Sequence, residues 1–267
     1  GLFYCHYCNW SGCAKEIDRQ PQTVYKPKPP TKQAEISHVA ITATHRKWLT
    51  EERGISDEAV NYAKLTSANV YMSQSGQYES CIGFNYYEHG KYVNTKYRSM
   101  QKHFKMVQGA ELIPYNIDGI QDTAECIITE GEIDALSFIT AGRTDVISVP
   151  SGANANLLWI DRLIATHFDN KKTIYIAVDT DVKGLALREE LIRRLGVDRC
   201  RIVTFSEGCK DANEQLLKHG ASSLNLMIAV AHEVPVEGIF NANDIITELQ
   251  NLYINGLKPG MKTGWTD

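Results

Sequence analysis

The sequence predicts an α/β protein in which helices flank a parallel central sheet. Four apolar, strand-like runs alternate with four helix-like runs between about residues 122 and 220. Strands that alternate with helices pair in parallel, and the helices then cover the faces of the sheet. The four pairs are ECIIT with EIDALSFITAG, DVISVP with NLLWIDRLIATHF, TIYIAV with GLALREELIRRLG, and CRIVTF with DANEQLLKHG.

Glycines predict where two of these helices end. Gly142 closes the first helical run and Gly196 the third, at the position where a helix commonly turns into a loop. Further helices are expected after Gly220, followed by a glycine-rich tail.

The chain before the sheet is predicted to be mixed α and β. TEERGISDEAVNYAKL has a helical pattern, with Ser56 as the N-cap before two acidic residues. ESCIGFNYYEHGKYVNTKYRS predicts a β-hairpin that turns at Glu88–Gly90. Residues 20–33 are rich in proline and lysine and indicate an extended linker.

Composition excludes several classes of protein. The 267 residues are 43 % apolar and 22 % charged, as in globular proteins. No apolar run approaches the roughly 18 residues that span a bilayer, and the first residues do not resemble a signal peptide. An odd number of scattered cysteines, seven, argues against a disulfide framework. We therefore expect an intracellular protein without a membrane partner.

Charge is distributed unevenly along the chain. Residues 1–110 carry 14 Lys/Arg and 9 Asp/Glu, whereas residues 111–267 carry 14 and 23. The asymmetry predicts a phosphate-binding surface beside a metal-binding one, although chance alone could also produce it.

Acidic residues follow three of the predicted strands. Glu130 follows ECIIT, Asp179 and Asp181 follow TIYIAV, and Asp211 begins the helix after CRIVTF. In a parallel sheet these positions share one edge, where ligands gather. Asp134 lies one helical turn after Glu130 and can face the same way. These five residues are called the acidic set below.

The acidic set predicts a site for a hard metal ion. Asp179 and Asp181, two residues apart, point to one side of an extended segment. Crowded carboxylates repel one another unless a cation neutralises them, and oxygen-only ligands suit Mg²⁺ or Mn²⁺. Gly184 permits a tight turn into the next helix, and Lys183 can reach a phosphate. The alternative is that each acid is only a helix cap or a solvated loop charge.

Three segments resemble the signatures of the Toprim domain: EGEIDALS at residues 130–137, VDTDVKG at 178–184 and GCKDANE at 208–214. DnaG-type primases, topoisomerases and some nucleases share that domain, and the third segment is most similar to phage-type and Twinkle-like primase-helicases. The resemblance implies that Glu130, Asp179, Asp181 and Asp211 serve catalytic metals, with Asp134 close by. It also implies that Glu130 acts in proton transfer.

GLFYCHYCNWSG, residues 1–12, resembles the second half of the zinc ribbon of phage primases. Tetrahedral Zn²⁺ needs two pairs of ligands, and only Cys5 and Cys8 have the right spacing. We therefore expect a half site whose other pair lies upstream of residue 1; His6 or Cys13 would fit poorly.

WLTEERGIS and residues 82–120 resemble the subdomain that precedes Toprim in primase-helicases. Its hairpin is basic, with Tyr92, Tyr97 and Phe104 interleaved, which suits phosphate binding and base stacking. The alternative is an ordinary solvated hairpin face. Lys96 and Arg98 are the strongest candidates for nucleotide or template binding. The predicted nucleotide- and DNA-binding residues are Lys91, Lys96, Arg98, Lys102, Lys105, Lys183 and Lys210.

The tail holds a false phosphate-loop motif. GLKPGMKT nearly matches the motif, but Met261 occupies a position that requires glycine. KTGWTD instead resembles the entry to the RecA-like helicase domain of the same family. The resemblance implies a helicase domain in the same polypeptide and a ring-shaped oligomer of the full-length protein.

The predicted organisation has five parts. They are a partial zinc ribbon (1–13), a linker (14–35), an N-terminal primase or RNA polymerase subdomain (36–120), a Toprim domain (121–220) and a helical linker leading to an absent helicase domain (221–267).

We expect a DNA primase fragment that makes short RNA primers from ribonucleoside triphosphates on single-stranded DNA. The expected cofactors are Mg²⁺ or Mn²⁺, with Zn²⁺ in the intact ribbon. The alternatives are a catalytically inactive Toprim DNA-binding scaffold of a Twinkle-like helicase, or a Toprim nuclease. A topoisomerase would need a further large domain. The expected location is the cytoplasm of a bacterium or infected host, with a mitochondrial relative possible.

Overall fold

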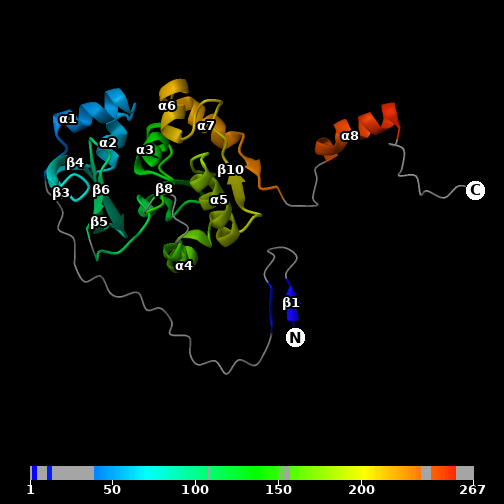
Figure 1. The fold of residues 1–267 in the computed structure, drawn as a ribbon, viewed down its shortest axis with the longest axis horizontal. Helices are drawn as coiled ribbons and strands as arrows, with labels where there is room; N and C mark the ends of the chain where they lie inside the picture. Colours follow the sequence, from blue (N-terminus) through cyan, green and yellow to red (C-terminus); the bar gives the residue numbers. More distant parts are fainter. Residues whose placement is uncertain are drawn as a thin grey trace, which may run out of the picture.

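The computed structural model describes residues 2–4, 11–13, 39–107, 109–150, 152, 157–235 and 242–256. Cys5 and Cys8, the predicted linker, and the GLKPGMKT and KTGWTD segments lie outside the described residues. Within them the chain forms a five-stranded sheet, a four-stranded sheet and a short two-stranded ladder (Figure 1). The ladder pairs β1 (Leu2–Tyr4) with β2 (Ser11–Cys13).

The five-stranded sheet has the order β11-β10-β9-β7-β8. The pairs β10–β9, β9–β7 and β7–β8 are all parallel, so the predicted parallel sheet is confirmed. Strand β11 pairs antiparallel with β10 and is an edge strand that the sequence did not predict. The strands are β7 (Glu125–Thr129), β8 (Val146–Ser148), β9 (Thr173–Ala177), β10 (Cys200–Ile202) and β11 (His232–Glu233).

The predicted helix follows each of the four parallel strands. Gly142 and Gly196 have φ of +84° and +99° and lie just beyond α3 and α5, which confirms both predicted ends. The second helical run, predicted as one helix, is divided into α4 and a π-helical turn, η3. The helices are α3 (Glu132–Thr140), α4 (Leu158–Leu163), η3 (Ile164–Phe168), α5 (Val182–Leu195), α6 (Ala212–His219), α7 (Ala221–Ala229) and α8 (Ala242–Asn255).

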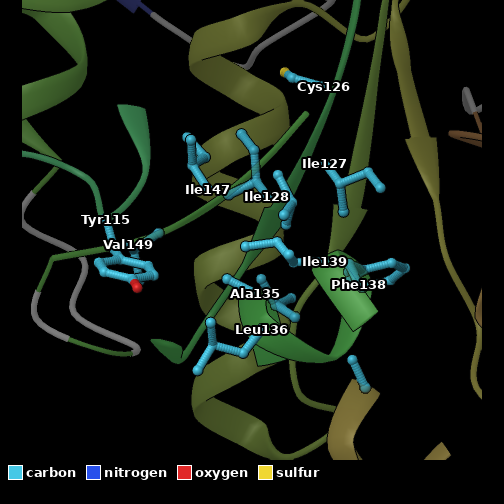
Figure 2. Packing of buried hydrophobic residues seen from close by; sticks show 14 of the residues in the cluster. Tyr115, Cys126, Ile127, Ile128, Ala135, Leu136, Phe138, Ile139, Ile147 and Val149 are labelled. Carbon is cyan, nitrogen blue, oxygen red and sulfur yellow. The ribbon is translucent and has the colours of Figure 1, made fainter. Parts of the chain in front are cut away.

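Strand β7 lies in the middle of the core (Figure 2). Its Ile127 and Ile128 are fully buried and pack with Ile147 of β8 and with Leu136 and Phe138 of α3. A β-branched run is stiff and suits a strand buried on both faces. Burying each such side chain stabilises the fold by about 1.5–3 kcal/mol.

The four-stranded sheet, called the hairpin sheet below, is antiparallel in the order β3-β4-β5-β6. The predicted hairpin is confirmed as β4–β5. His89 and Gly90 at its turn have φ of +51° and +71°, the positive values that a tight two-residue hairpin turn requires. The strands are β3 (Thr66–Met72), β4 (Gln77–Glu88), β5 (Lys91–Ser99) and β6 (Phe104–Met106).

Short helices accompany the hairpin sheet. The predicted cap of α2 is confirmed, because the Ser56 hydroxyl accepts a hydrogen bond from the backbone N–H of Ala59 at 3.1 Å. The helices are α1 (Ala43–Lys47), the π-helical η1 (Trp48–Glu52), α2 (Asp57–Tyr62) and the 3-10 helix η2 (Ile117–Ile120). No helix among the described ranges has the length and apolarity needed to cross a membrane.

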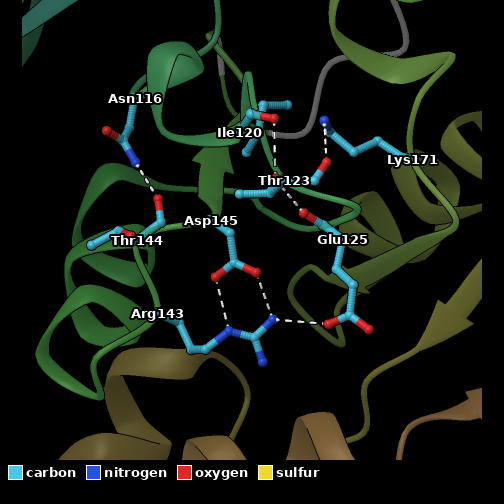
Figure 3. Close-up of polar contacts among 8 residues, drawn as sticks. All are labelled: Asn116, Ile120, Thr123, Glu125, Arg143, Thr144, Asp145 and Lys171. Atoms are coloured by element: carbon cyan, nitrogen blue, oxygen red, sulfur yellow. Dashed lines mark hydrogen bonds and ion pairs between the residues drawn. The ribbon is translucent and has the colours of Figure 1, made fainter.

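A polar network joins the chain around the amino ends of the parallel strands (Figure 3). The Arg143 guanidinium donates to both carboxylate oxygens of Asp145, at 2.8 and 2.6 Å, and lies 3.5 Å from Glu125. The Lys171 ammonium donates to the Thr123 carbonyl at 2.7 Å. Charged groups at this end of the sheet are thus largely paired with one another, whereas the acidic set lies at the carboxyl ends.

Candidate functional site

The parallel strands carry four members of the acidic set to one edge. Glu130 directly follows β7, Asp179 and Asp181 follow β9 by two and four residues, and Asp211 lies between β10 and α6. Because β7, β9 and β10 are adjacent and parallel, their carboxyl ends meet. Asp134 lies in the first turn of α3, and the charges of Asp211, Asp179 and Glu130 raise its pKa, so it belongs to the same group.

Two of the acids cap helices. Asp181 accepts a hydrogen bond from the backbone N–H of Gly184 at 2.8 Å, and Asp211 accepts one from Glu214 at 2.7 Å. The capping alternative therefore describes part of what these two residues do. A carboxylate has about four lone-pair sites, so a cap leaves capacity for another partner. The N–H of Thr180 also donates to the carbonyl of Lys210 at 3.2 Å, which holds the two acidic loops side by side.

Gly184 lets helix α5 begin directly against Asp179. A Cβ atom at this position would lie 2.1 Å from the backbone oxygen of Asp179. Only glycine fits such an approach without a backbone shift. The tight turn predicted from the sequence thus fixes the backbone that carries Asp179.

The acidic set shares one electrostatic environment. Burial and the added repulsion from Glu130, Asp211 and Asp181 raise the pKa of Asp179 to about 7. Burial also raises the pKa of Asp134 well above its usual value, with added repulsion from Asp211, Asp179 and Glu130. Like charges that lie close together disfavour ionisation, and a bound cation would reverse that effect.

The donor set fits Mg²⁺ or Mn²⁺. All five side chains offer carboxylate oxygen, the ligand that these ions prefer. No three of their oxygens lie within 4.8 Å of one another in the described part of the chain, so the acids form an open arrangement and not a closed cage. Magnesium commonly uses one or two carboxylates and keeps several waters, which suits an open site.

Asn213 connects the acidic set to the segment before the hairpin sheet. Its backbone N–H donates to a carboxylate oxygen of Asp134 at 3.1 Å. Its side-chain amide donates to the carbonyl of Arg53 at 2.8 Å and to the hydroxyl of Ser137 at 3.1 Å, and its amide oxygen accepts from the Arg53 guanidinium at 3.2 Å. Asn213 is buried, so these bonds fix the position of Arg53 relative to Asp134.

Two arginines stack on one tryptophan next to this connection. The guanidinium groups of Arg53 and Arg98 lie 4.8 and 4.5 Å from the ring of Trp48, and Arg98 also lies 6.0 Å from Phe104. Only 5 % of Arg98 is exposed. Burial lowers the pKa of Arg98 to about 10, and the charge of Arg53 contributes to that shift. Positive charge is thus concentrated beside the acidic set.

Lys96 joins the hairpin sheet to the parallel sheet. Its ammonium lies 2.9 and 3.1 Å from the two carboxylate oxygens of Glu132, and both side chains are nearly buried. The Tyr86 hydroxyl donates to the same carboxylate at 2.6 Å. Burial raises the pKa of Tyr86, and the Glu132 charge adds to the effect, so Tyr86 keeps its proton. The structure places the two strongest phosphate-binding candidates, Lys96 and Arg98, in internal contacts.

The other predicted basic residues lie at the surface. Lys105 donates to the Tyr71 carbonyl at 2.9 Å, and Lys210 lies 3.9 Å from Asp211 and 3.7 Å from Glu214. Lys183 lies in the first turn of α5, next to Asp181. The exposed members are Lys91, Lys102, Lys105, Lys183 and Lys210.

Sequence reasoning did not assign Arg53, Trp48, Glu132 or Asn213 to the site. Glu132 and Asn213 do stand inside two of the quoted signatures, so the signal was present in the motifs. Their roles depend on partners 36 and 160 residues away, which local spacing does not show.

The model of the Toprim-like family matches residues 127–216. The chain is 35 % identical over 230 residues to the Twinkle homolog protein, chloroplastic/mitochondrial, of Arabidopsis thaliana, covering 78 % of this chain and 32 % of that protein. It is 34 % identical over 195 residues to the primase homolog protein of the same plant, covering 65 % and 57 %. The chain thus spans about a third and just over half of these two curated relatives.

Solved structures show the same fold. The primase fragment of the bacteriophage T7 primase-helicase has a TM-score of 0.60 at 22 % identity, covering 85 % of this chain and 90 % of that one. A second match is a chain from the structure of the bacteriophage T7 lagging-strand DNA polymerase interacting with primase domains of two gp4 subunits bound to an RNA/DNA hybrid and dTTP. It also has a TM-score of 0.60, at 25 % identity, and the match covers 68 % of this chain and 91 % of that one. In sequence and fold the chain is thus similar to Toprim primases of the Twinkle and T7 type, and its residues 127–216 match the Toprim-like family.

Proposed function

We propose that this chain is the priming part of a replicative primase-helicase and joins ribonucleoside triphosphates into short RNA primers on single-stranded DNA. The observation that carries the proposal is the coupled acidic set beside the Arg53–Trp48–Arg98 stack. Nucleotidyl transfer needs metal-binding carboxylates next to cations that hold phosphates, and the site offers both.

Asp179 and Asp181 would hold Mg²⁺ or Mn²⁺, with Asp211 and Glu130 completing the site. The bound ion supplies positive charge that acidifies a primer hydroxyl and neutralises charge on the reacting phosphate. Glu130, directly after β7, would accept the hydroxyl proton. Asn213 keeps Asp134 in place beside this group.

The basic residues divide into two groups. Arg53 is held by Asn213 and Trp48, so it suits a fixed position for triphosphate oxygens, whereas the buried Arg98 supports the same tryptophan from within. The exposed lysines of the hairpin sheet, Lys91, Lys102 and Lys105, suit the template backbone. Lys183 and Lys210, next to Asp181 and Asp211, complete the proposed nucleotide contacts. In support, T7 primase domains have been solved with an RNA/DNA hybrid and dTTP.

The full-length protein is proposed to have parts outside this chain. They are an upstream cysteine pair that completes a Zn²⁺ site with Cys5 and Cys8, and a downstream helicase domain that forms a ring. The plant relative, of which this chain covers 32 %, is named chloroplastic/mitochondrial. An organelle is therefore a proposed location beside the cytoplasm.

The test is primer synthesis from single-stranded DNA, the four ribonucleoside triphosphates and Mg²⁺, using the protein with an intact ribbon. Asp179→Asn combined with Asp181→Asn should lower the rate by at least about 100-fold, because the principal metal ligands are lost. Asp122→Asn is the matched control, since Asp122 is exposed just before β7, at the opposite end of the strand. Primer synthesis that survives the double substitution would overturn the site assignment.

The same assay separates the alternatives. An inactive scaffold would bind DNA without making primers, and in calorimetry it would bind Mg²⁺ no better than Asp179→Asn. A nuclease would shorten labelled DNA in the presence of Mg²⁺ without needing ribonucleoside triphosphates.

A further inference from the structure

The tip of the β4–β5 hairpin lies against the π-helical turn η3. Glu88 and His89 are at the tip, and His167 comes from η3. The two imidazole rings have centroids 5.7 Å apart. One ligand atom from each of the three residues lies within 4.8 Å of the others. Two segments 78 residues apart thus bring two histidines and a carboxylate together, and none of the three residues belongs to the acidic set.

The buried histidine has a nitrogen without a hydrogen-bond partner. His167 is only 1 % exposed, and its Nδ1 lies 2.8 Å from the hydroxyl of Thr166. Its Nε2 is buried and has no hydrogen-bond partner among the described residues. A buried polar atom in that state calls for an explanation, and a bound ion is one of the recognised ones. With Nδ1 engaged by Thr166, Nε2 remains to bind a metal, the arrangement usual for histidine ligands.

The hairpin tip is held in place by a second carboxylate. Asp118 of η2 accepts hydrogen bonds from the backbone N–H groups of His89 at 2.6 Å and Gly90 at 2.8 Å. These bonds fix the positive-φ backbone from which the His89 side chain projects. They also place a further negative charge beside the histidines, which favours a cation.

The Glu88 carboxylate already forms an ion pair with Arg162. Arg162 lies 3.0 Å from Glu88 and 3.3 Å from Glu111. It is more than a third exposed and can keep its bond to Glu111 if Glu88 turns to an ion. The carboxylates Glu88, Glu111 and Asp118 outnumber this arginine, so the local charge leaves room for a divalent ion.

We propose that Glu88, His89 and His167 form a binding site for a divalent transition metal of the zinc class, which fastens the hairpin tip to the parallel-sheet half of the molecule. Two imidazoles and one carboxylate are zinc-type ligands, unlike the oxygen-only acidic set. Zinc bonds of about 2.0–2.2 Å require donor atoms about 3.5 Å apart, so the donors must close slightly. The exposed His89 side chain can make that movement, and a fourth position stays open to solvent.

The test is Zn²⁺ titration by calorimetry on the full chain carrying Cys5→Ser and Cys8→Ser, with millimolar Mg²⁺ present to occupy the acidic set. We expect one equivalent of Zn²⁺ and a raised melting temperature. His89→Ala should weaken binding at least about tenfold and remove the thermal shift, since a ligand is lost. Because His89 is exposed, this variant should fold; Glu88→Gln gives an isosteric second test.

His219→Ala is the matched control, because His219 is an exposed histidine at the end of α6. It should leave the Zn²⁺ affinity unchanged. Co²⁺ substituted at the site should show visible d–d bands that disappear in His89→Ala. Failure of the reference chain to bind one equivalent, or equal affinity in the His89→Ala and His219→Ala chains, would overturn the proposal. Neither result depends on whether the protein makes primers.

Discussion

The ammonium group of Lys96 lies 2.9 Å from the carboxylate of Glu132, and this ion pair joins the hairpin sheet to helix α3 of the parallel sheet. The exposed fractions of the two side chains are 13 % and 6 %. Removing one partner of an ion pair so little exposed lowers the stability of the fold strongly, because the other partner stays charged and buried. The contact therefore couples the position of the basic hairpin to the segment that follows Glu130.

Lys96→Met should lower the free energy of unfolding by about 3 kcal/mol, since it leaves Glu132 without its counter-ion. Adding Glu132→Gln to this variant should restore part of the loss, because the amide is neutral and still accepts from Tyr86. Urea unfolding measures both. Lys102→Met, at an exposed lysine of the same sheet, should change stability by no more than about 0.5 kcal/mol. Equal losses in Lys96→Met and Lys102→Met would show that the ion pair is not a structural contact.

The parallel sheet could be predicted from sequence because the signals for its strands and helices lie within short segments of the chain. Each strand is a short apolar run, and glycines such as Gly196 end helices where the pattern predicts. The edge position of Glu130 and Asp179 followed from that topology. The partners of Lys96 and Arg98 could not be predicted, because charge and aromatic spacing are the same whether a hairpin face is open or covered. Whether the face is covered depends on the packing of η1 and α3 against it, which places Trp48 over Arg98 and Glu132 beside Lys96.

Asn213→Ala should weaken the connection between Arg53 and Asp134. The substitution removes two donated bonds and one accepted bond inside the protein, which should cost about 1–3 kcal/mol of stability. Primer synthesis should fall further than the loss of folded protein explains, because Arg53 is no longer held. The matched control is Asn225→Ala, an exposed amide that donates to the Ala141 carbonyl at 2.9 Å and should cost little. If both variants behave alike, Asn213 has no special role in the site.

Gly184→Ala should disturb the acidic set without touching a carboxylate. The new methyl group would lie 2.1 Å from the backbone oxygen of Asp179, so that backbone must move. We expect a loss of about 2 kcal/mol in stability and weaker Mg²⁺ binding in calorimetry. Ala186→Gly, at an exposed position of the same helix, should cost about 1 kcal/mol and leave Mg²⁺ binding intact. Normal Mg²⁺ affinity in Gly184→Ala would contradict the link between this turn and Asp179.

Glu79 should make the stability of the hairpin sheet depend on acid pH. The hydroxyls of Ser75 and Ser99, together with His103, whose ring nitrogen lies 2.8 Å away, lower the pKa of Glu79 from 4.5 to about 2. A carboxylate with a lowered pKa stabilises the folded state in full above its unfolded pKa of about 4.5, and the contribution disappears as the pH falls towards 2. Glu79→Gln should therefore destabilise the protein at pH 7 and make progressively less difference below pH 4.5.

Urea midpoints of the Glu79→Gln and unsubstituted chains at pH 7, 4.5 and 3 measure this dependence. The difference should be constant from pH 7 to about 5 and smaller at pH 3, because the unsubstituted chain then loses what the variant lacks. Glu52→Gln is the control, since Glu52 is exposed at the end of η1 and should give a small difference at every pH. A Glu79→Gln difference that stays the same at pH 3 and pH 7 would mean that the ionised carboxylate does not stabilise this sheet.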